Sequence, residues 1–142
     1  MYDLPELDYT DLLDKPFKLG ARGPDKYDCW GLCLEIGKRV GIDYPLFFTP
    51  TETEEQDQAI KVVSESLFEE IDKPEPYCIA TFRIHPPFVD HCGIVLFDTF
   101  YFLHTITNHR VVRQRLDVYN KRLYGFYKLK ISGISTKDIE CN

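Results

Sequence analysis

One set of apolar residues in the first third of the chain recurs at the spacing of an amphipathic helix. Its members are Cys29, Leu32, Cys33, Ile36 and Val40. Asp28 directly precedes the set, and a short acidic side chain there can accept a hydrogen bond from the first free N–H groups of a helix. Gly41 follows the set, at the position where a glycine commonly ends a helix. The pattern therefore predicts a helix with Asp28 as its N-cap and Cys29 as its first residue.

Two more helical segments are indicated, one on each side of this helix. Thr51-Glu52-Thr53-Glu54 fits a capping box, in which the first and fourth side chains bond each other's backbone N–H groups. The apolar positions Ile60, Val63 and Leu67 then share one face, which predicts a helix over residues 52–68. An acidic stretch with scattered leucines favours a short helix over residues 9–13.

The second half of the chain has the short apolar runs and turn residues of a β-sheet. Residues 85–88, which read His-Pro-Pro-Phe, form a loop, because proline cannot donate to a strand ladder. The predicted strands are residues 77–84, 91–97, 100–106, 111–116 and 124–131. Helices that precede strands joined by short connections predict an α+β fold, with N-terminal helices packed on an antiparallel sheet of five to six strands.

The chain has the length and composition of one globular domain, with 142 residues of which 44% are hydrophobic and 28% charged. We expect this domain to span residues 1–132 and residues 133–142 to form a mobile C-terminal tail. No apolar run is long enough to span a membrane, and a net charge of −6 argues against nucleic-acid binding. The five cysteines show no disulfide framework. Because residues 1–6 lack the features of a signal peptide, we expect a protein made in the cytoplasm with reduced thiols.

Cys29 is the first candidate for chemistry. At the start of a helix, free backbone N–H groups and the positive end of the helix dipole favour a thiolate, which is the nucleophilic form of cysteine. A small buried packing residue explains the same position equally well, since free cysteines are commonly buried. The helix start alone does not decide between these alternatives.

Two of the four histidines, His91 and His104, lie in apolar strand patterns. Residues 97–100, which join these strands, are too few for anything but a hairpin. If Asp98 and Thr99 form its loop, the position numbers of opposed residues add to 197, and His91 is a diagonal neighbour of His104 on the same face. If the loop lies one residue earlier, the numbers add to 195 and the two histidines are directly opposed. A three-residue loop would put them on opposite faces.

Three interpretations of this histidine pair are open. The pair can be structural, with its hydrogen bonds satisfied by backbone or water. It can be a base and its orienting partner, with His91 taking a thiol proton and His104 holding the ring of His91 in the right tautomer. The third interpretation is a metal site formed by Cys29, Cys33, His91 and Cys92. The alternation of strand side chains argues against the metal site, because the neighbours His91 and Cys92 point to opposite faces.

Several segments resemble motifs of the NlpC/P60 cysteine peptidases. Residues 20–32, which read Gly-Ala-Arg-Gly-Pro-Asp-Lys-Tyr-Asp-Cys-Trp-Gly-Leu, are similar to the nucleophile segment of that family. Residues 91–96 resemble its second motif and residues 102–104 its third. The Arg-Gly-Pro-Asp lead-in and the Trp after the Cys are similar to the phage and prophage branch, as are Arg115-Leu116 and residues 124–127. The resemblance covers residues 9–130 in the order of the family's motifs.

The resemblance implies a papain-like core in which Cys29 is the nucleophile, His91 the base and His104 the third polar residue. Members of the family mostly cleave stem peptides of bacterial cell walls, commonly between D-glutamate and a diamino acid. We therefore expect a cysteine peptidase of peptidoglycan stem peptides, of phage or prophage origin, that needs no cofactor and no metal. Its partners would be the stem peptides and, in a phage tail, the other tail proteins, so that it would act at the cell wall.

The resemblance also implies an oxyanion and substrate-binding set. Tyr27 matches the tyrosine that lies by the catalytic centre of the family, and Asp28 matches the aspartate linked to binding the free amine of the substrate. Trp30 completes the set, although it stands where many cell-wall members have a serine that contacts the substrate, and a role in packing explains it as well.

Two alternatives use the same fold. A structural tail or tail-tip protein would keep the core of the family without turnover. A transferase or amidase would use the same thiol centre on another acyl acceptor.

Overall fold

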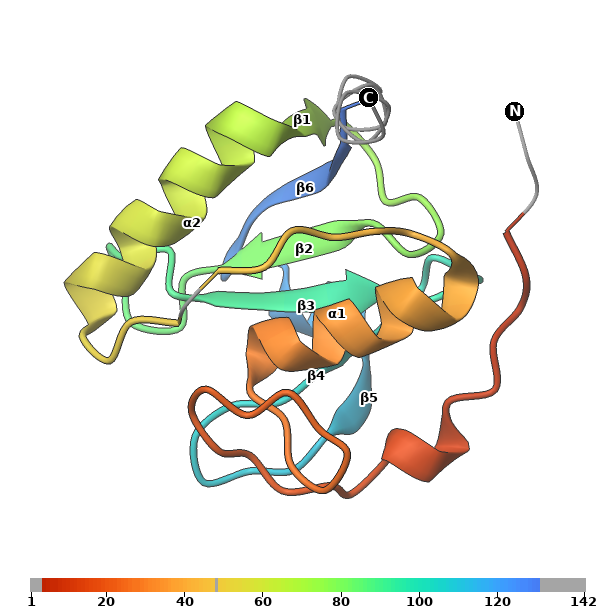
Figure 1. The fold of residues 1–142 in the computed structure, drawn as a ribbon. Helices are drawn as coiled ribbons and strands as arrows, with labels where there is room; N and C mark the ends of the chain where they lie inside the picture. Colours follow the sequence, from red (N-terminus) through yellow and green to blue (C-terminus); the bar gives the residue numbers. More distant parts are fainter. Residues whose placement is uncertain (1–3, 48, 131–142) are drawn as a thin grey trace, which may run out of the picture.

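Two helices pack on one face of a six-stranded antiparallel sheet in the computed structural model, which describes residues 4–47 and 49–130 (Figure 1). The helical elements are the 3-10 turns η1 (Thr10–Leu12) and η2 (Leu116–Tyr119) and the α-helices α1 (Cys29–Val40) and α2 (Thr53–Leu67). The strands are β1 (Phe68–Ile71), β2 (Ile79–Phe82), β3 (His91–Val95), β4 (Tyr101–His104), β5 (Val112–Arg115) and β6 (Leu123–Leu129). Their order across the sheet is β1-β6-β2-β3-β4-β5. The α+β fold expected from the sequence is confirmed.

Helix α1 forms as its sequence predicts. The Asp28 carboxylate accepts a hydrogen bond from the Gly31 N–H at 2.7 Å, which satisfies one of the free donors at the helix start. At the other end Gly41 has a φ of +87°, a left-handed conformation that costs glycine little, and its N–H bonds the Gly37 carbonyl. Both signals are local, and together they place Cys29 on the first helical residue.

Helix α2 begins differently from the prediction. Its N-cap is Glu52, whose side chain makes no capping hydrogen bond, so the predicted capping box is wrong. The Gln56 side chain instead donates from Nε2 to the Pro50 carbonyl at 2.7 Å, within the segment that leads into the helix. The short helix predicted over residues 9–13 is the 3-10 turn η1.

Five strands lie where they are predicted, each within two residues at both described ends. The sixth, β1, was not predicted, because it directly follows α2 and contains two acidic residues between Phe68 and Ile71. Pairing with β6, in which Phe68 lies opposite Leu129, makes it an edge strand. The last residue of the strand predicted over 124–131 and the predicted tail over 133–142 lie outside the described residues.

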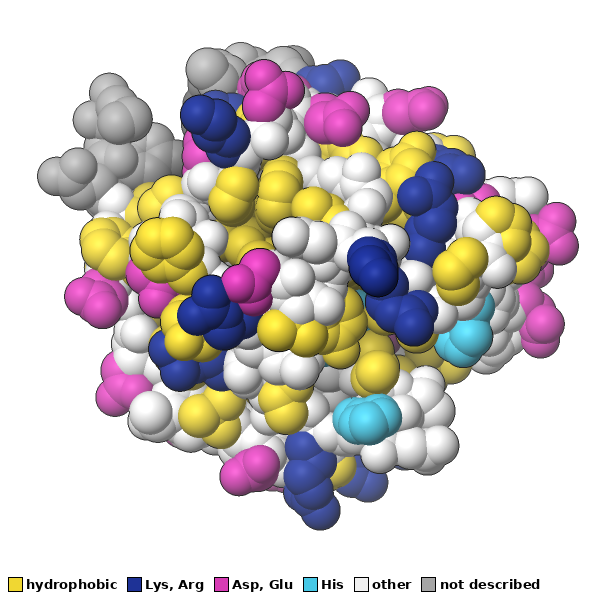
Figure 2. Space-filling model, turned by 180° about the vertical axis from the view of Figure 1, so that it is seen from behind, with side chains coloured by type: hydrophobic (Ala, Val, Ile, Leu, Met, Phe, Trp, Pro, Cys, Tyr) yellow, Lys and Arg dark blue, Asp and Glu magenta, His cyan; other side chains and the backbone are white. Residues whose placement is uncertain are grey.

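The sheet has an apolar layer on each face. On one side the buried face of α1, including Ile36, packs on Ile94 and Leu103 of the central strands. On the other side Phe82 and Phe102 stack with ring centroids 5.1 Å apart. The molecule seen from behind has hydrophobic side chains interspersed with both acidic and basic ones (Figure 2). No helix in the described part of the chain is long and apolar enough to cross a membrane.

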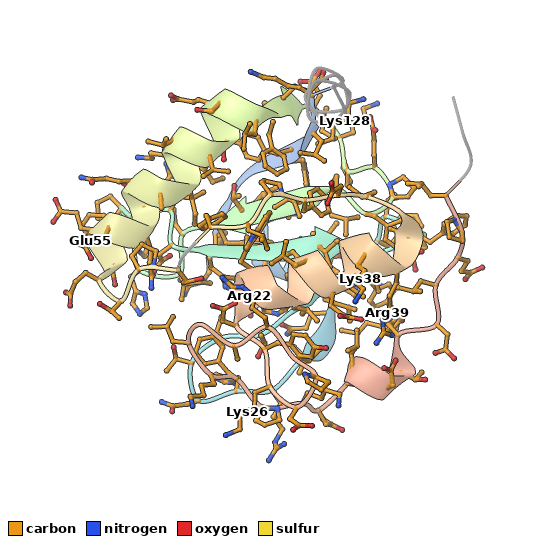
Figure 3. All side chains as sticks on the ribbon, viewed as in Figure 1. Arg22, Lys26, Lys38, Arg39, Glu55 and Lys128 are labelled. Carbon is orange, nitrogen blue, oxygen red and sulfur yellow. The ribbon has the colours of Figure 1, made fainter. Side chains whose placement is uncertain are left out.

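Several contacts fasten the N-terminal segment to the rest of the molecule, and two of them bear on the position of α1. The Arg39 guanidinium at the end of α1 reaches down to η1, where it forms a bidentate pair with Asp11 at 2.7 Å (Figure 3). Further along, the N–H of Phe17 donates to the His109 carbonyl at 3.1 Å. These contacts bring the segment before α1 alongside the loop that follows β4, next to the start of α1.

Candidate active site

The starts of α1 and β3 meet at three polar side chains. Cys29 is the first residue of α1 and His91 the first residue of β3, and the Cys29 thiol interacts with both the His91 imidazole and the Cys92 thiol. His91 belongs to the sheet face turned away from α1, where its ring lies 5.8 Å from that of Phe82. Because it begins the strand, its ring can meet Cys29 at the strand's end.

The two histidines are hydrogen-bonded to each other. In the β3–β4 hairpin Ile94 lies opposite Leu103, so opposed positions add to 197, which is the register expected for a loop at Asp98 and Thr99. His91 is then the diagonal neighbour of His104, and its Nε2 lies 2.9 Å from the Nδ1 of His104. The prediction that an even-length loop puts both imidazoles on one face is confirmed.

Gly93 makes room for this pair. It lies opposite His104 in the hairpin, where a Cβ atom would be 3.1 Å from the Cβ of His104 and 2.7 Å from Cδ2 of Phe102. The contact with Phe102 is shorter than carbon atoms adopt and the contact with His104 is tight, so a side chain at this position would force its neighbours to shift.

A glutamine continues the line of polar groups. Gln114 lies on β5, and its Oε1 is 2.5 Å from the Nε2 of His104. An amide oxygen only accepts, so His104 carries its proton on Nε2 and accepts the Nε2–H of His91 at Nδ1. The remaining nitrogen of His91, Nδ1, is left with a lone pair for the Cys29 thiol. We call Cys29, His91, His104 and Gln114 the relay.

Burial keeps both imidazoles of the relay neutral at physiological pH. It lowers the pKa of His104 to about 4, against the opposing effect of the Gln114 hydrogen bond. Burial also lowers the pKa of His91, although the neighbouring Cys29 acts in the opposite direction. His91 is therefore available as a proton acceptor at neutral pH.

The surroundings of Cys29 favour the thiol over the thiolate. Its hydrogen bond with Cys92 and its burial raise the Cys29 pKa well above the ordinary value, and the interaction with His91 only partly opposes this. The expectation of a lowered pKa from the helix start is wrong for this structure.

Replacing Cys92 with valine is expected to lower the Cys29 pKa and to speed alkylation of Cys29 at neutral pH. Valine fills a similar volume but removes the thiol that favours the protonated form of Cys29. The measurement is the rate of iodoacetamide labelling at Cys29 against pH, followed by mass mapping. Cys78→Val is the matched control, because Cys78 is also buried but packs on the other side of the sheet. Unchanged or slower labelling of Cys29 in Cys92→Val would show that the Cys92 thiol does not raise the Cys29 pKa.

Asp28 is fully buried and its two oxygens are both occupied. Oδ1 accepts from Gly31 and forms an ion pair of 2.6 Å with Arg22, while Oδ2 accepts the Gly20 N–H at 2.9 Å. The Arg22 side chain lies at the start of α1 and also donates to the Phe47 carbonyl at 2.9 Å (Figure 3). These contacts join three segments around the helix start. Binding of a substrate amine by Asp28 stays a prediction, and it would require displacing Arg22.

Replacing Asp28 with alanine is expected to destabilise the fold by about 2 kcal/mol, the upper end for loss of a helix cap, because two backbone donors and a partly buried guanidinium lose their acceptor. Urea denaturation measures the loss. Asp117→Ala removes the exposed pair with Arg115 and should leave the stability nearly unchanged. Equal effects of the two substitutions would show that the Asp28 contacts do not hold the helix start.

The other two members of the predicted substrate-binding set differ in position. Trp30 lines the cleft at Cys29, and it also packs on Phe47 with centroids 5.0 Å apart and donates its Nε1–H to the Pro45 carbonyl. Tyr27 is buried against Gly23, and among the described residues it does not line the cleft. The structure gives Tyr27 a packing role, and its part in an oxyanion site stays a prediction.

The described residues contain no group of three or more His, Cys, Asp or Glu side chains arranged to hold a metal ion. The four residues considered for a metal site nevertheless lie close together, because the Cys92 thiol interacts with those of both Cys29 and Cys33. The alternation argument did not anticipate that Cys29 would contact both His91 and Cys92.

A cleft of about 450 Å³ opens beside the relay. It is walled by the segment before α1, the start of α1, the segment before α2, α2 itself and the loops before β3 and after β4. Its lining comprises Phe17, Leu19, Asp28, Cys29, Trp30, Phe47, Thr49, Pro50, Gln56, Ala59, Ile60, Ile84, His85, Asp90, His91, Cys92, Thr105, Ile106, Thr107 and Asn108.

No protein-family model matches the chain, and the comparison with curated proteins gives no match. Two solved structures are similar over most of it. NlpC1 from Trichomonas vaginalis shares 26% identity with a TM-score of 0.57, over 84% of this chain and 41% of that one. NlpC2 from the same organism shares 23% identity with a TM-score of 0.56, over 82% and 42% of the two chains.

These likenesses support the NlpC/P60 resemblance and show that the chain has the fold of these NlpC proteins. They do not support the narrower phage-tail branch. The chain spans about two fifths of the length of both solved structures.

Sequence reasoning missed two features of the site. Gln114 lies in a strand whose polar face looks like ordinary solvent exposure, and only its pairing with β4 brings it to His104. Thr105 directly follows His104, and the alternation of side chains along a strand could have placed it on the face turned toward the helices.

Proposed function

We propose that the chain is a cysteine peptidase of the NlpC/P60 type. The observation that carries the proposal is the relay, in which a thiol at a helix start meets an imidazole that is held by a second imidazole and an amide. A nucleophile, a base and an orienting group in hydrogen-bonding sequence are what acyl transfer requires. The roles are Cys29 as nucleophile, His91 as base and His104 as positioning residue.

The first step of the proposed reaction is attack of the Cys29 sulfur on a peptide carbonyl while the Nδ1 of His91 takes the thiol proton. The imidazolium of His91 keeps its Nε2–H on His104 and then gives the new proton to the leaving amine. Water attacks the resulting thioester, assisted by the same nitrogen, and releases the acid. Because the pKa of Cys29 is raised, proton transfer accompanies the attack and does not precede it as a stable ion pair.

The start of α1 is the proposed oxyanion site. Among the N–H groups of the first turn, the Asp28 cap accepts from that of Gly31, and this leaves the N–H groups of Cys29 and Trp30 for the developing charge. Asp28 thereby orients the helix start, and the donor that it occupies is the N–H of Gly31, the last of these three residues.

The substrates we propose are stem peptides of bacterial peptidoglycan, as in most members of the family that the chain resembles. The origin we propose is a phage or prophage, with synthesis in the cytoplasm and action at the cell wall from a phage tail. Both proposals rest on the motif resemblance in residues 20–32 and 91–104.

A catalytically silent tail protein is the second candidate, and one observation favours it. The surroundings of Cys29 raise the pKa of its thiol, with the Cys92 thiol as the largest cause. A core kept for packing alone would tolerate such a neighbour beside the nucleophile.

Incubation of the purified chain with peptidoglycan fragments, followed by mass spectrometry of released peptides, tests the proposal. We expect new amine and carboxyl ends in equal amounts, and none with Cys29→Ala. The absence of cleavage by the parent chain across a set of stem peptides and unrelated peptides would favour the silent tail protein. Cleavage that persists in Cys29→Ala would overturn the role of the thiol.

A further inference from the structure

Three thiol groups from two elements meet beside the cleft. Cys29 and Cys33 lie one turn apart on the same face of α1, and Cys92 is the second residue of β3. Cys33 and Cys92 belong to the apolar core between α1 and the sheet, and Cys29 packs against this core. The Cys92 thiol interacts with the thiols of both other cysteines. The proposed hydrolysis uses only Cys29, so it gives the other two thiols no chemical role.

The three cysteines differ in their access to solvent. Cys29 is half-buried, whereas Cys33 and Cys92 have exposed fractions of 0% and 4%. Cys29 and Cys92 both line the cleft, and Cys33 is not part of its described lining. A small reagent that enters the cleft therefore meets the Cys29 sulfur first, and the Cys92 thiol lies next to it.

Cys92 does not favour the proposed hydrolysis, because its thiol is the largest cause of the raised Cys29 pKa. An aliphatic side chain such as valine would fill the same apolar position without this effect, since a buried cysteine packs as a small hydrophobic residue. A thiol differs from an aliphatic side chain in that it can form a covalent bond to the sulfur of Cys29. The contact between Cys29 and Cys92 therefore points to thiol chemistry between the two residues.

We propose that Cys29 and Cys92 form a reversible disulfide when the chain meets a hydroperoxide. The Cys29 sulfur bonds one oxygen atom of the peroxide, while the thiol proton passes through His91 to the departing oxygen, which leaves as water or an alcohol. The Cys92 sulfur then attacks the sulfenic acid of Cys29, and the oxygen of that acid leaves as water with the Cys92 proton. The two cysteines together lose two electrons to the peroxide, and two thiol groups of a reductant return them.

The position of Cys29 allows the two sulfur atoms to reach bonding distance. A disulfide has a sulfur–sulfur distance of about 2.05 Å, so hydrogen-bonded thiols must move closer together. Cys29 is the first residue of α1, and no preceding helical turn restricts the rotation of its side chain. The raised pKa of Cys29 slows the first step, because the thiolate is the reactive form. We therefore expect the disulfide to form during sustained exposure to peroxide.

The inference goes beyond the proposed peptidase and does not require turnover. A Cys29 sulfur held in a disulfide cannot attack a carbonyl, so oxidation would inactivate a hydrolase and reduction would restore it. Without Cys92, the sulfenic acid of Cys29 would remain open to a second molecule of peroxide. The product would then be a sulfinic acid, which thiol reductants do not reverse. Cys92 thus protects Cys29 from irreversible oxidation.

Mass mapping of the oxidised chain tests the inference. The protein is the full chain with Cys141→Ser, which removes the one cysteine outside the described residues, and the reagents are hydrogen peroxide and dithiothreitol. We expect the intact chain to lose two hydrogen atoms and to yield a pair of peptides linked from Cys29 to Cys92. Iodoacetamide labelling of Cys29 should fall at least about tenfold and return with dithiothreitol. Oxidation of Cys29 to sulfinic acid without a link, or a link to Cys33 instead, would overturn the proposal.

Replacing Cys92 with valine in the same background removes the second thiol of the pair. Peroxide should then convert Cys29 to sulfinic acid, and dithiothreitol should restore less than about a tenth of the labelling. Cys78→Val is the matched control, because Cys78 is 2% exposed but lies on the other side of the sheet, and it should form the link as the parent chain does. Cys33→Val should also keep the link. Full recovery of Cys29 labelling in both Cys92→Val and Cys92→Ala would contradict the role of Cys92.

The outcomes separate this inference from the proposed function. If the link forms but the parent chain cleaves no peptide, the disulfide stands and the peptidase proposal fails alone. If the parent chain cleaves peptides and peroxide inactivates it irreversibly without a link, the peptidase stands and the disulfide fails.

Discussion

Replacing His91 with glutamine is expected to lower the rate of peptide hydrolysis by about 10³-fold, within the range that a general base contributes. Glutamine occupies a similar volume, but it cannot take the thiol proton of Cys29. Since burial lowers the pKa of His91 and keeps it neutral, the parent chain has this acceptor available at neutral pH. The measurement is kcat/KM on the peptide that the cell-wall experiment identifies.

A substrate-independent assay accompanies this measurement. The thiol of Cys29 should react with iodoacetamide more slowly in His91→Gln than in the parent chain, because the interaction that favours its thiolate is lost. His109→Gln is the matched control, since His109 is an exposed loop residue outside the cleft lining, and it should keep the parent rate. Parent-like hydrolysis by His91→Gln, with both variants folded, would remove His91 from the role of base.

The parts of the fold that the sequence predicts are those fixed by neighbouring residues. Helix α1 follows from Asp28, a run of apolar positions and Gly41, all within one segment. The shared face of His91 and His104 follows from the even length of one hairpin loop. Neighbouring residues do not predict strand β1, because its partner β6 lies more than fifty residues further along the chain and β1 itself has only two apolar residues.

The geometry of the site depends on contacts between segments that are distant in the sequence, and a local sequence pattern does not predict such contacts. The start of α2 offered a capping box, yet the chain before it turns so that Glu52 becomes the cap. Cys92 sits next to a predicted catalytic residue, but its effect on the Cys29 pKa depends on how α1 lies over β3. Gln114 reaches His104 only because Phe102 lies opposite Gln114 in the β4–β5 pair, a register set by the connection after β4.

Replacing Gln114 with leucine is expected to slow hydrolysis about 10²-fold, the lower end of what general base catalysis contributes. The amide oxygen of Gln114 keeps the His104 proton on Nε2 and, through it, leaves the lone pair of His91 facing Cys29. Leucine removes the acceptor, so both imidazoles lose their fixed tautomers. Nitrogen NMR of the labelled rings should then show mixed tautomers at His104. Arg113→Leu, on the same strand but stacked over Tyr101 on the other face, should change neither the rate nor the spectra.

Replacing Gln114 with glutamate distinguishes a positioning role of Gln114 from a packing role, because the two roles predict different pH dependence of the hydrolysis rate. A carboxylate still accepts the Nε2–H of His104, so the rate at alkaline pH should stay close to that of the parent chain. Its negative charge stabilises the imidazolium and raises the pKa of His104 above its value of about 4. Once protonated, His104 cannot accept from His91, and the acid limb of the pH–rate profile should therefore move to higher pH. In Gln114→Leu the loss of a hydrogen bond that raises this pKa should not move the limb upward. Identical pH profiles for the parent and Gln114→Glu, or a parent-like rate in Gln114→Leu, would show that Gln114 only fills space beside the histidines.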